Sequence, residues 1–231
     1  LSNCAEDIEL ALFILIHGAC HGAWCWDQTL PFFDNGPHRA LAIDLPGRGP
    51  GAAPPETVTM ADFGRAILAA AEGVAGPVVL VGHSMGGYAI TAAALMAPGR
   101  FARLVHLSAY MPEPGVSLND IARAWPERPL RPAIRLAPDR RSFGFDPAVA
   151  RDLFYHDCPP EAADRALARL CPEPTGPHAA IFDADPATPR HYVVCTADRA
   201  IPVGHQQAMA ARLPAECRSS LPSGHAPFLA M

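Results

Sequence analysis

The chain has 231 residues, of which 50% are hydrophobic and 18% charged, so it carries enough apolar material for a folded core and too few charges for a disordered chain. Its net charge of −5 at pH 7, without a basic stripe, argues against a nucleic-acid-binding protein. All 18 basic residues are arginine, which excludes mechanisms that need a lysine, such as a Schiff base or a lysine general base.

The sequence carries no targeting or membrane signal. The longest apolar run, Leu10–Ile16, is far shorter than the roughly 18 residues of a membrane span. Residues 1–9 contain acids and lack the basic start of a signal peptide. Seven cysteines without a CxxC pair predict reduced thiols and no zinc ribbon. We therefore expect a cytoplasmic protein that binds neither membrane nor nucleic acid.

The first third of the chain alternates between apolar runs and turn-forming residues. In chain order it predicts a buried strand at Leu10–Ile16, a helix or helical turn at Trp24–Phe33, a strand at Arg39–Ile43, a loop over 47–55 and a helix at Thr59–Val74. Apolar residues recur on one face of that last segment, and its first residue is a typical helix N-cap.

The same alternation resumes further along. It predicts a strand at Pro77–Val81, a tight turn over 82–87, a helix at Met85–Met96, a strand at Ala102–Leu107, a strand at Arg190–Thr196, a helix at Val203–Leu213 and a strand at Cys217–Leu221. Alternating strands and helices are typical of an α/β fold with a mostly parallel sheet and helices on both faces. We predict one such domain over residues 1–231.

The alternation breaks between residues 112 and 189, which are rich in proline. Short helical stretches are predicted at Pro147–Phe154 and Glu161–Leu170. The segment is too long for a loop and too irregular for a sheet crossover, so we predict an inserted lid of short helices. A separate small domain is the alternative.

The turn after Pro77–Val81 contains a candidate nucleophile. Gly82-His83-Ser84-Met85-Gly86 matches G-x-S-x-G, with a predicted strand before it and a helix after it. This setting is that of a nucleophile elbow, in which small neighbours allow a sharp strand-to-helix turn and expose the serine at the helix N-terminus. The alternative is an ordinary turn with a capping serine.

An activated serine needs a base and an acid, which follow it in the order acid, then histidine, in this fold class. His225 lies in a Gly-flanked loop just after the last predicted strand, and Asp198 lies just after Arg190–Thr196. The carboxyl ends of parallel strands are where catalytic side chains gather. Asp183 and Asp185 are rival acids, but they precede their strand.

Two backbone N–H groups should bind the oxyanion of such a site. Met85 follows the nucleophile, and Ala19 lies in the loop after the first predicted strand, where Gly18 allows a close approach. We find no metal-ligand motif and no cofactor motif, and so expect neither a metal nor a cofactor.

Together these segments resemble the α/β-hydrolase superfamily, and within it the plant methylesterase, salicylate-binding and hydroxynitrile lyase group with its bacterial esterase relatives. The resemblance is carried by residues 17–26 (HGACHGAWCW), 44–47 (DLPG), 82–87 (GHSMGG), 153–158 (LFYHDC), 198–202 (DRAIP) and 224–228 (GHAPF). It implies Ser84, Asp198 and His225 as the catalytic triad, and Ala19 and Met85 as the oxyanion donors.

The sequence departs from that group in two places. The plant lyases pair the triad with a lysine and with a threonine in the first loop, whereas this chain has no lysine and has Gly18 after His17, so we do not expect the lyase mechanism. The family continues with a helix after the catalytic histidine, whereas only Ala226–Met231 follow here, so we expect the natural chain to be longer.

We therefore predict a serine hydrolase that cleaves small carboxylic esters, with a small-molecule ester as its partner. Substrate contacts are expected from His17, Gly18, His83, Trp125, Phe154 and Tyr155, and Phe143 and Phe182 of the lid could also line an apolar pocket. Alternatives are a C–C bond hydrolase or thioesterase on the same triad, or a protein that binds a small aromatic acid with weak turnover. The sequence is compatible with a homodimer as well as with a monomer.

Overall fold

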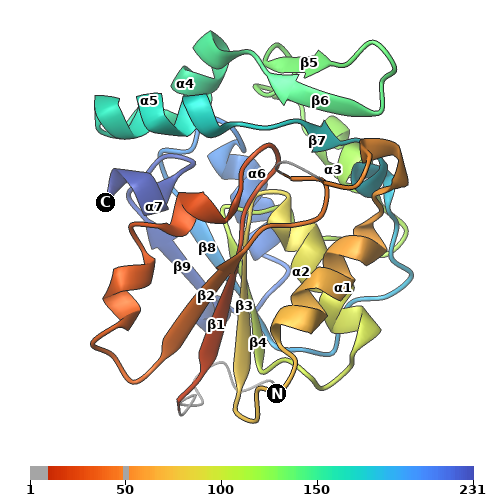
Figure 1. Cartoon of the computed structure of the whole chain (residues 1–231), viewed down its shortest axis with the longest axis vertical. Helices are drawn as coiled ribbons and strands as arrows, with labels where there is room; N and C mark the ends of the chain where they lie inside the picture. Colours follow the sequence, from red (N-terminus) through yellow and green to blue (C-terminus); the bar gives the residue numbers. More distant parts are fainter. Residues whose placement is uncertain (1–9, 49–51) are drawn as a thin grey trace.

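The computed structural model describes residues 10–48 and 52–231. Its main sheet has six strands in the order β2-β1-β3-β4-β8-β9, all parallel (Figure 1). The strands are β1 Leu12–Ile16, β2 Arg39–Ile43, β3 Val78–His83, β4 Arg103–Leu107, β8 Arg190–Cys195 and β9 Arg218–Leu221. The predicted α/β class and all six predicted strands are confirmed. The strands β1 and β3 are the apolar runs that a sheet covered on both faces requires at its centre.

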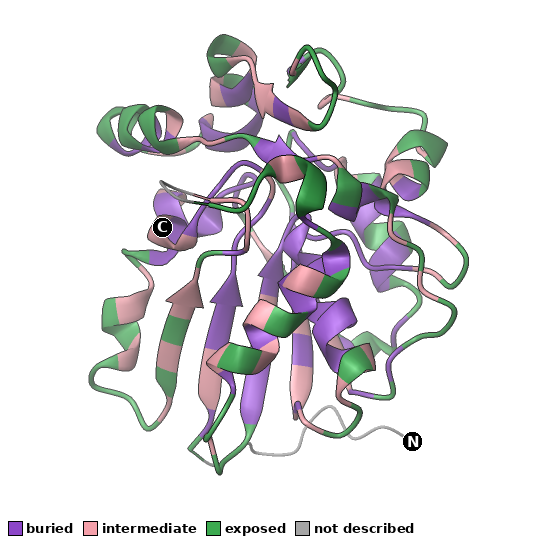
Figure 2. Ribbon diagram, turned by 45° about the vertical axis from the view of Figure 1, so that its right-hand side comes forward, coloured by how far each residue is buried: buried purple, intermediate pink, exposed green. Residues whose placement is uncertain are grey.

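The helices that cover the sheet are α1 Met60–Ala70, α2 Gly86–Met96 and α6 Val203–Ala210. A capping box starts α1: the Thr59 side chain accepts from the Asp62 N–H, and the Asp62 carboxylate accepts from the Thr59 N–H at 2.8 Å. The predicted cap is therefore correct, although the helix ends before Val74. Almost all of α2 is buried, as Figure 2 shows, because it lies between the sheet and α1.

Two predicted segments differ from the structure. Trp24–Phe33 forms two short 3-10 helices, η1 Ala23–Trp26 and η2 Leu30–Phe33, rather than one helix. A third 3-10 helix, η3 Pro55–Thr57, ends the predicted loop, of which residues 49–51 lie outside the described residues. The absence of a signal peptide was predicted from residues 1–9, which also lie outside them.

The insertion between β4 and β8 covers the carboxyl ends of the sheet strands (Figure 1). It contains α3 Leu118–Ala124, β5 Ile134–Leu136, β6 Ser142–Phe145, α4 Pro147–Tyr155, α5 Pro160–Arg169, β7 Glu173–Pro174 and η4 Gly176–Ala179. The expectation of helices alone is wrong, because β5, β6 and β7 form a small antiparallel sheet. Strands of two to four residues are too short to show an alternating pattern.

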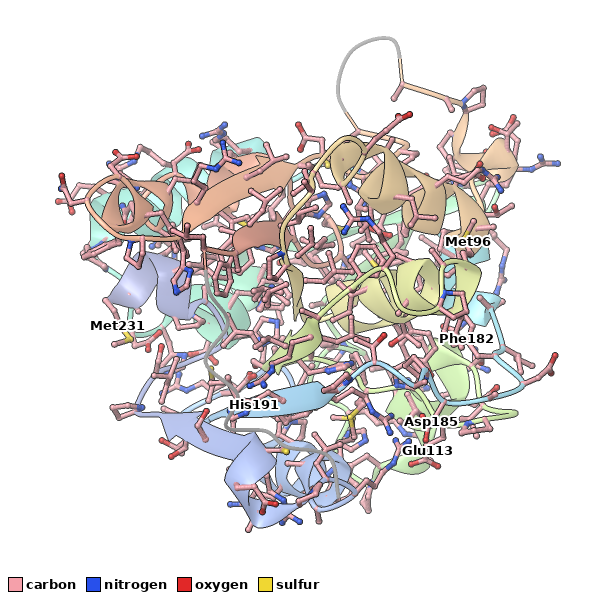
Figure 3. All side chains as sticks on the ribbon, turned by 90° about the horizontal axis from the view of Figure 1, so that it is seen from below. Met96, Glu113, Phe182, Asp185, His191 and Met231 are labelled. Carbon is pink, nitrogen blue, oxygen red and sulfur yellow. The ribbon has the colours of Figure 1, made fainter. Side chains whose placement is uncertain are left out.

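The two chain segments that enter and leave the insertion are held together at its base. Arg212, just after α6, bonds to the Pro112 carbonyl at 2.7 Å and ion-pairs with Glu113 at 3.3 Å and Asp185 at 3.6 Å. Figure 3 shows the two acidic side chains on the same side of the molecule. The Gly115 N–H also donates to the Phe182 carbonyl at 2.8 Å. The insertion is therefore anchored to the main domain at both ends.

The described residues contain both free and disulfide-bonded cysteines. Cys217 is disulfide-bonded, so the prediction of reduced thiols is wrong at this position. Five free thiols remain, at Cys20, Cys25, Cys158, Cys171 and Cys195. Within residues 10–48 and 52–231, every helix is too short or too polar to span a membrane.

Candidate active site

Ser84 lies in the sharp turn between β3 and α2, with φ +54°, a conformation that non-glycine residues rarely adopt. Its glycine neighbours make the turn possible. A Cβ on Gly82 would lie 2.5 Å from the Gly86 carbonyl oxygen, and one on Gly86 would lie 2.9 Å from the His17 carbonyl oxygen. The G-x-S-x-G spacing is therefore a steric requirement of this turn, and the turn places Ser84 in the wall of a cavity.

His225 and Asp198 approach the same cavity from the loops after β9 and β8. The His225 Nδ1–H donates to Asp198 Oδ2 at 2.8 Å, and both side chains are buried. This bond fixes the imidazole so that its Nε2 remains for another partner. His225 lines the same cavity as Ser84, and Asp198 is joined to this site through His225.

Four further donors hold the Asp198 carboxylate. Oδ1 accepts from the backbone N–H groups of Ala200 at 2.7 Å and Ile201 at 3.0 Å. Oδ2 accepts from Gln206 Nε2 at 2.8 Å and from the Ser108 hydroxyl. A carboxylate with this many donors is held in one orientation, as a group that positions a histidine requires.

Backbone strain is concentrated at the ends of three adjacent strands. Cys20, Ser84 and Ser108 all have positive φ, at +62°, +54° and +45°, and follow β1, β3 and β4. Each contacts or belongs to the site: Ser108 bonds to Asp198, and Cys20 follows the predicted oxyanion donor Ala19. Strain of this kind persists only where surrounding contacts enforce it, and it is concentrated at functional sites.

Ala19 and Met85 line the cavity on either side of Ser84. In the part of the chain that the structure describes, neither backbone N–H donates to another backbone group. Met85 is also the N-cap of α2, so its amide lies at the positive end of a helix. Two unpaired donors beside a serine form the arrangement that an oxyanion requires.

Three histidines surround the site in neutral form. Burial lowers the pKa of His17 to about 3 and that of His21 to about 4, and it lowers the pKa of His83 well below its usual range. His83 Nε2–H donates to the His225 carbonyl at 2.8 Å, and the two rings lie 4.6 Å apart. His83 therefore supports the loop that carries His225.

Three of the six expected substrate contacts are found at the cavity. Gly18, His83 and Phe154 line it, and the Phe154 ring lies 5.3 Å from the ring of His225. A Cβ on Gly18 would lie 2.9 Å from the Ser84 Cβ, which explains why this position lacks a side chain. The structure also places Phe143 on the cavity wall.

The other three lie behind the wall. His17 is fully buried, and its Nε2 accepts from the Leu45 N–H at 3.1 Å, so it fixes the loop after β2. The Tyr155 hydroxyl bonds to His21 Nε2 at 2.7 Å, and Trp125 stacks on His205 at 4.6 Å. Of these partners, His21 and His205 line the cavity, whereas Leu45 belongs to the loop after β2. The prediction of direct substrate contact is therefore corrected for His17, Tyr155 and Trp125. Phe182 likewise packs on Tyr88.

A buried carboxylate of the insertion holds the loop that carries Ala19. Glu173 of β7 is fully buried, ion-pairs with Arg48, and accepts from the Cys20 N–H at 2.9 Å. Burial would raise the pKa of Glu173, but Arg48, His178 and the Cys20 amide outweigh it and leave the pKa below its usual value. Arg48 in turn donates to the His21 carbonyl at 3.2 Å. The insertion therefore fixes the oxyanion loop as well as covering it.

A second carboxylate of the insertion holds the loop that carries His225. Asp157, two residues after α4, accepts from the Gly224 N–H at 2.5 Å and from the Ser223 hydroxyl at 3.3 Å. A Cβ on Gly224 would lie 2.5 Å from Asp157 Oδ1, so the glycine is required for this approach. Both sides of the site are therefore tied to the insertion.

The cavity has a volume of about 610 Å³, and its walls come from the sheet loops and from the insertion. That size suits a small organic molecule. No group of three His, Cys, Asp or Glu side chains that could hold a metal ion occurs among residues 10–48 and 52–231.

Four residues of the site were not found from the sequence: Ser108, Gln206, Glu173 and Asp157. Ser108 follows β4, and its place at a strand end is the signal that could have identified it. Gln206 and Glu173 lie in helical or proline-rich segments with no local motif. Asp157 lies in residues 153–158, which carry part of the family resemblance, but it was not singled out there. The roles of these three residues arise from contacts with residues between 8 and 153 positions away.

The chain is similar in sequence to several plant proteins. Methylesterase 9 of Arabidopsis thaliana is 36% identical over 104 residues, which are 44% of this chain and 41% of that protein. Norfluorocurarine synthase 1 of a Strychnos species is 31% identical over 215 residues, or 84% of this chain and 80% of that protein. The matches to the first two curated relatives span less than half of each relative's length, at 41% and 43%.

Among solved structures, a pyrethroid hydrolase from Sphingobium faniae superposes with a TM-score of 0.86 and 26% sequence identity, over 96% of this chain and 92% of that one. A family model described as "Alpha/beta hydrolase family" matches residues 13–231, which include every residue of the site described above. The chain belongs to the alpha/beta hydrolase family.

Proposed function

We propose that this protein is a serine hydrolase that cleaves small carboxylic esters. The observation that carries the proposal is the 2.8 Å bond between His225 and Asp198. His225 lines the same cavity as Ser84, whose backbone is strained in the turn between β3 and α2. The proposal is supported by the names of relatives, among them methylesterase 9 and methyl jasmonate esterase 1.

In the proposed reaction, His225 Nε2 takes the proton of the Ser84 hydroxyl as Oγ attacks the ester carbonyl. Asp198 keeps the imidazole in the required tautomer and stabilises the imidazolium. The N–H groups of Ala19 and Met85 bind the negative oxygen of the tetrahedral intermediate. His225 then protonates the leaving alcohol, and a water activated by the same nitrogen hydrolyses the acyl-enzyme.

The test is hydrolysis of p-nitrophenyl acetate and butyrate by the protein and by its Ser84→Ala variant, with fluorophosphonate labelling of both. We expect turnover and labelling of the parent protein and neither in the variant. Turnover that survives in Ser84→Ala would overturn the assignment of the nucleophile.

Two other outcomes separate the alternatives. Labelling of Ser84 without ester turnover would favour a C–C bond hydrolase or thioesterase on the same triad, which thioester and β-diketone substrates would distinguish. A folded protein with neither labelling nor turnover would favour a binding protein for a small acid. One relative is named a synthase rather than an esterase, which is the reason to test these alternatives to ester hydrolysis.

A further inference from the structure

Arginines are concentrated on the part of the insertion that faces the cavity. Residues 118–145 contain six arginines and three carboxylates, although the whole chain has a net charge of −5. Four of these arginines line the cavity with a single carboxylate, Glu127; they are Arg123, Arg128, Arg131 and Arg140. The rim of the cavity is therefore positive.

These guanidinium groups are weakly engaged with the protein itself. Arg123 approaches Asp120 only to 4.0 Å, and Arg128 bonds to the Trp125 carbonyl at 3.4 Å. In the described part of the chain, Arg131 and Arg140 have no ion-pair partner. By contrast, Arg135, on the same hairpin, pairs with Asp146 at 2.9 Å and does not line the cavity.

An apolar wall connects the catalytic residues with this rim. From the His225 ring, Phe154 lies at 5.3 Å, Phe145 lies 4.9 Å beyond it, and Phe143 lies 5.6 Å further on. Phe143 and Phe145 belong to β6, which pairs with β5. Arg131 precedes β5, whose first residue pairs with Phe145, and Arg140 lies in the turn between β5 and β6, beyond Phe143, so the two arginines lie at opposite ends of this hairpin.

From this arrangement we propose that the preferred substrate is an ester with an apolar body and an anionic group, such as a carboxylate, at the end away from the scissile bond. The ester carbonyl lies at Ser84 and the apolar body lies along the phenylalanines. The anion is bound by Arg131 when the body ends near Phe145 and by Arg140 when the body extends past Phe143. Guanidinium groups bind carboxylates through charge-assisted, often bidentate, hydrogen bonds. This inference rests on the proposed esterase function and specifies its substrate class.

The test compares monomethyl esters of linear dicarboxylic acids with methyl esters of monocarboxylic acids of equal carbon number. We expect the charged member to have a kcat/KM about tenfold higher at the best chain length, the magnitude of one hydrogen bond between charged groups. Raising the ionic strength from about 0.02 to 0.5 M should shrink this ratio, because salt screens exposed charges.

Variants locate the anion-binding groups. The double variant Arg131→Gln/Arg140→Gln should bring the charged-to-neutral ratio close to 1. The matched control Arg135→Gln removes an equally exposed arginine of the same hairpin and should leave the ratio unchanged. Equal kcat/KM for both members in the parent protein, without salt dependence, would overturn the proposal while leaving the esterase function intact.

Binding to Ser84→Ala tests the proposal without catalysis. Calorimetry should show tighter binding of the half-ester than of its uncharged partner, and the difference should disappear when Arg131 and Arg140 are also replaced. If the parent protein hydrolyses no ester, this measurement still decides whether the rim selects anions. Equal affinity for both ligands would contradict the proposal.

Discussion

The insertion buries a carboxylate against an arginine, whereas three histidines on the sheet side are buried as neutral rings. Burial lowers the pKa of His17 to about 3, that of His21 to about 4 and that of His106 to about 3, so the sheet side holds these rings neutral. The insertion instead buries Glu173 as an ion, compensated by Arg48 and by the Cys20 amide.

The difference follows from what each region has to hold in place. The sheet strands are fixed by their backbone ladder, so a neutral ring that fills space is sufficient there. The insertion has only short elements and needs a strong directional contact to keep its position over the site. A buried ion pair supplies such a contact at a large desolvation cost, so loss of one partner is expected to be severe.

The largest expected effect is on the sheet side. Asp198→Asn should lower kcat by about 1,000- to 10,000-fold for p-nitrophenyl butyrate, because the neutral amide no longer enforces the His225 tautomer. Asp183→Asn, an exposed acid considered as a rival from the sequence, should leave kcat unchanged. The reverse ranking in steady-state kinetics would move the catalytic acid to the insertion.

The next effect is on the insertion. Glu173→Gln leaves the Arg48 guanidinium buried without its counter-charge, so the free energy of unfolding should fall by about 3 kcal/mol. The kcat should fall as well, because Cys20 adjoins the oxyanion donor Ala19. Urea unfolding and steady-state kinetics measure both.

The control is Asp164→Asn, which breaks an exposed ion pair with Arg151 and should lower the free energy of unfolding by less than about 0.5 kcal/mol. Similar losses for both variants would show that the buried pair is not a special anchor.

The two regions should also lose stability in different pH ranges. A histidine that is neutral when folded but protonated when unfolded makes the unfolded state bind more protons, so stability falls as pH drops below about 6.5. Glu173 has a lowered pKa, so its contribution is present above its unfolded value and is lost only at more acidic pH.

His106→Leu isolates the histidine effect away from the cavity, because this ring is fully buried in β4. Between pH 7 and pH 5 the variant should lose less stability than the parent protein, by about 2 kcal/mol. Urea unfolding at the two pH values measures the difference, and His38→Leu, at a partly exposed histidine, serves as the control. Parallel pH profiles for parent and variant would contradict the assignment of His106 as a neutral buried ring.

The smallest effect concerns the second anchor of the insertion. Asp157→Asn keeps an oxygen that can accept from the Gly224 N–H but removes the charge, so we expect a loss of about 1 kcal/mol in unfolding free energy and a several-fold decrease in kcat. Asp152→Asn, at an exposed pair with Arg199, should change neither quantity. An unchanged kcat in Asp157→Asn would limit the role of the insertion to the oxyanion side.

The sequence by itself determined the parallel α/β sheet and the turn that carries Ser84, and it predicted Asp198 and His225 as the partners of that serine. Strand periodicity is local, and the nucleophile turn needs Gly82 and Gly86 for steric reasons that leave a readable spacing. Strand periodicity and the glycine spacing each lie within a short stretch of residues, so both can be recognised without a structure.

Only the tertiary structure decided which side chains form the cavity and what holds the insertion over it. His17 and Tyr155 carry the right chemistry and lie in the expected segments, yet neither lines the cavity: His17 bonds to Leu45, and Tyr155 bonds to His21 from behind. Glu173 bears no motif and Asp157 was not singled out within its segment, and their roles come from contacts with Cys20 and Gly224, far away in the sequence. Such contacts depend on how the insertion packs on the sheet, and that packing is a property of the whole chain rather than of any local pattern.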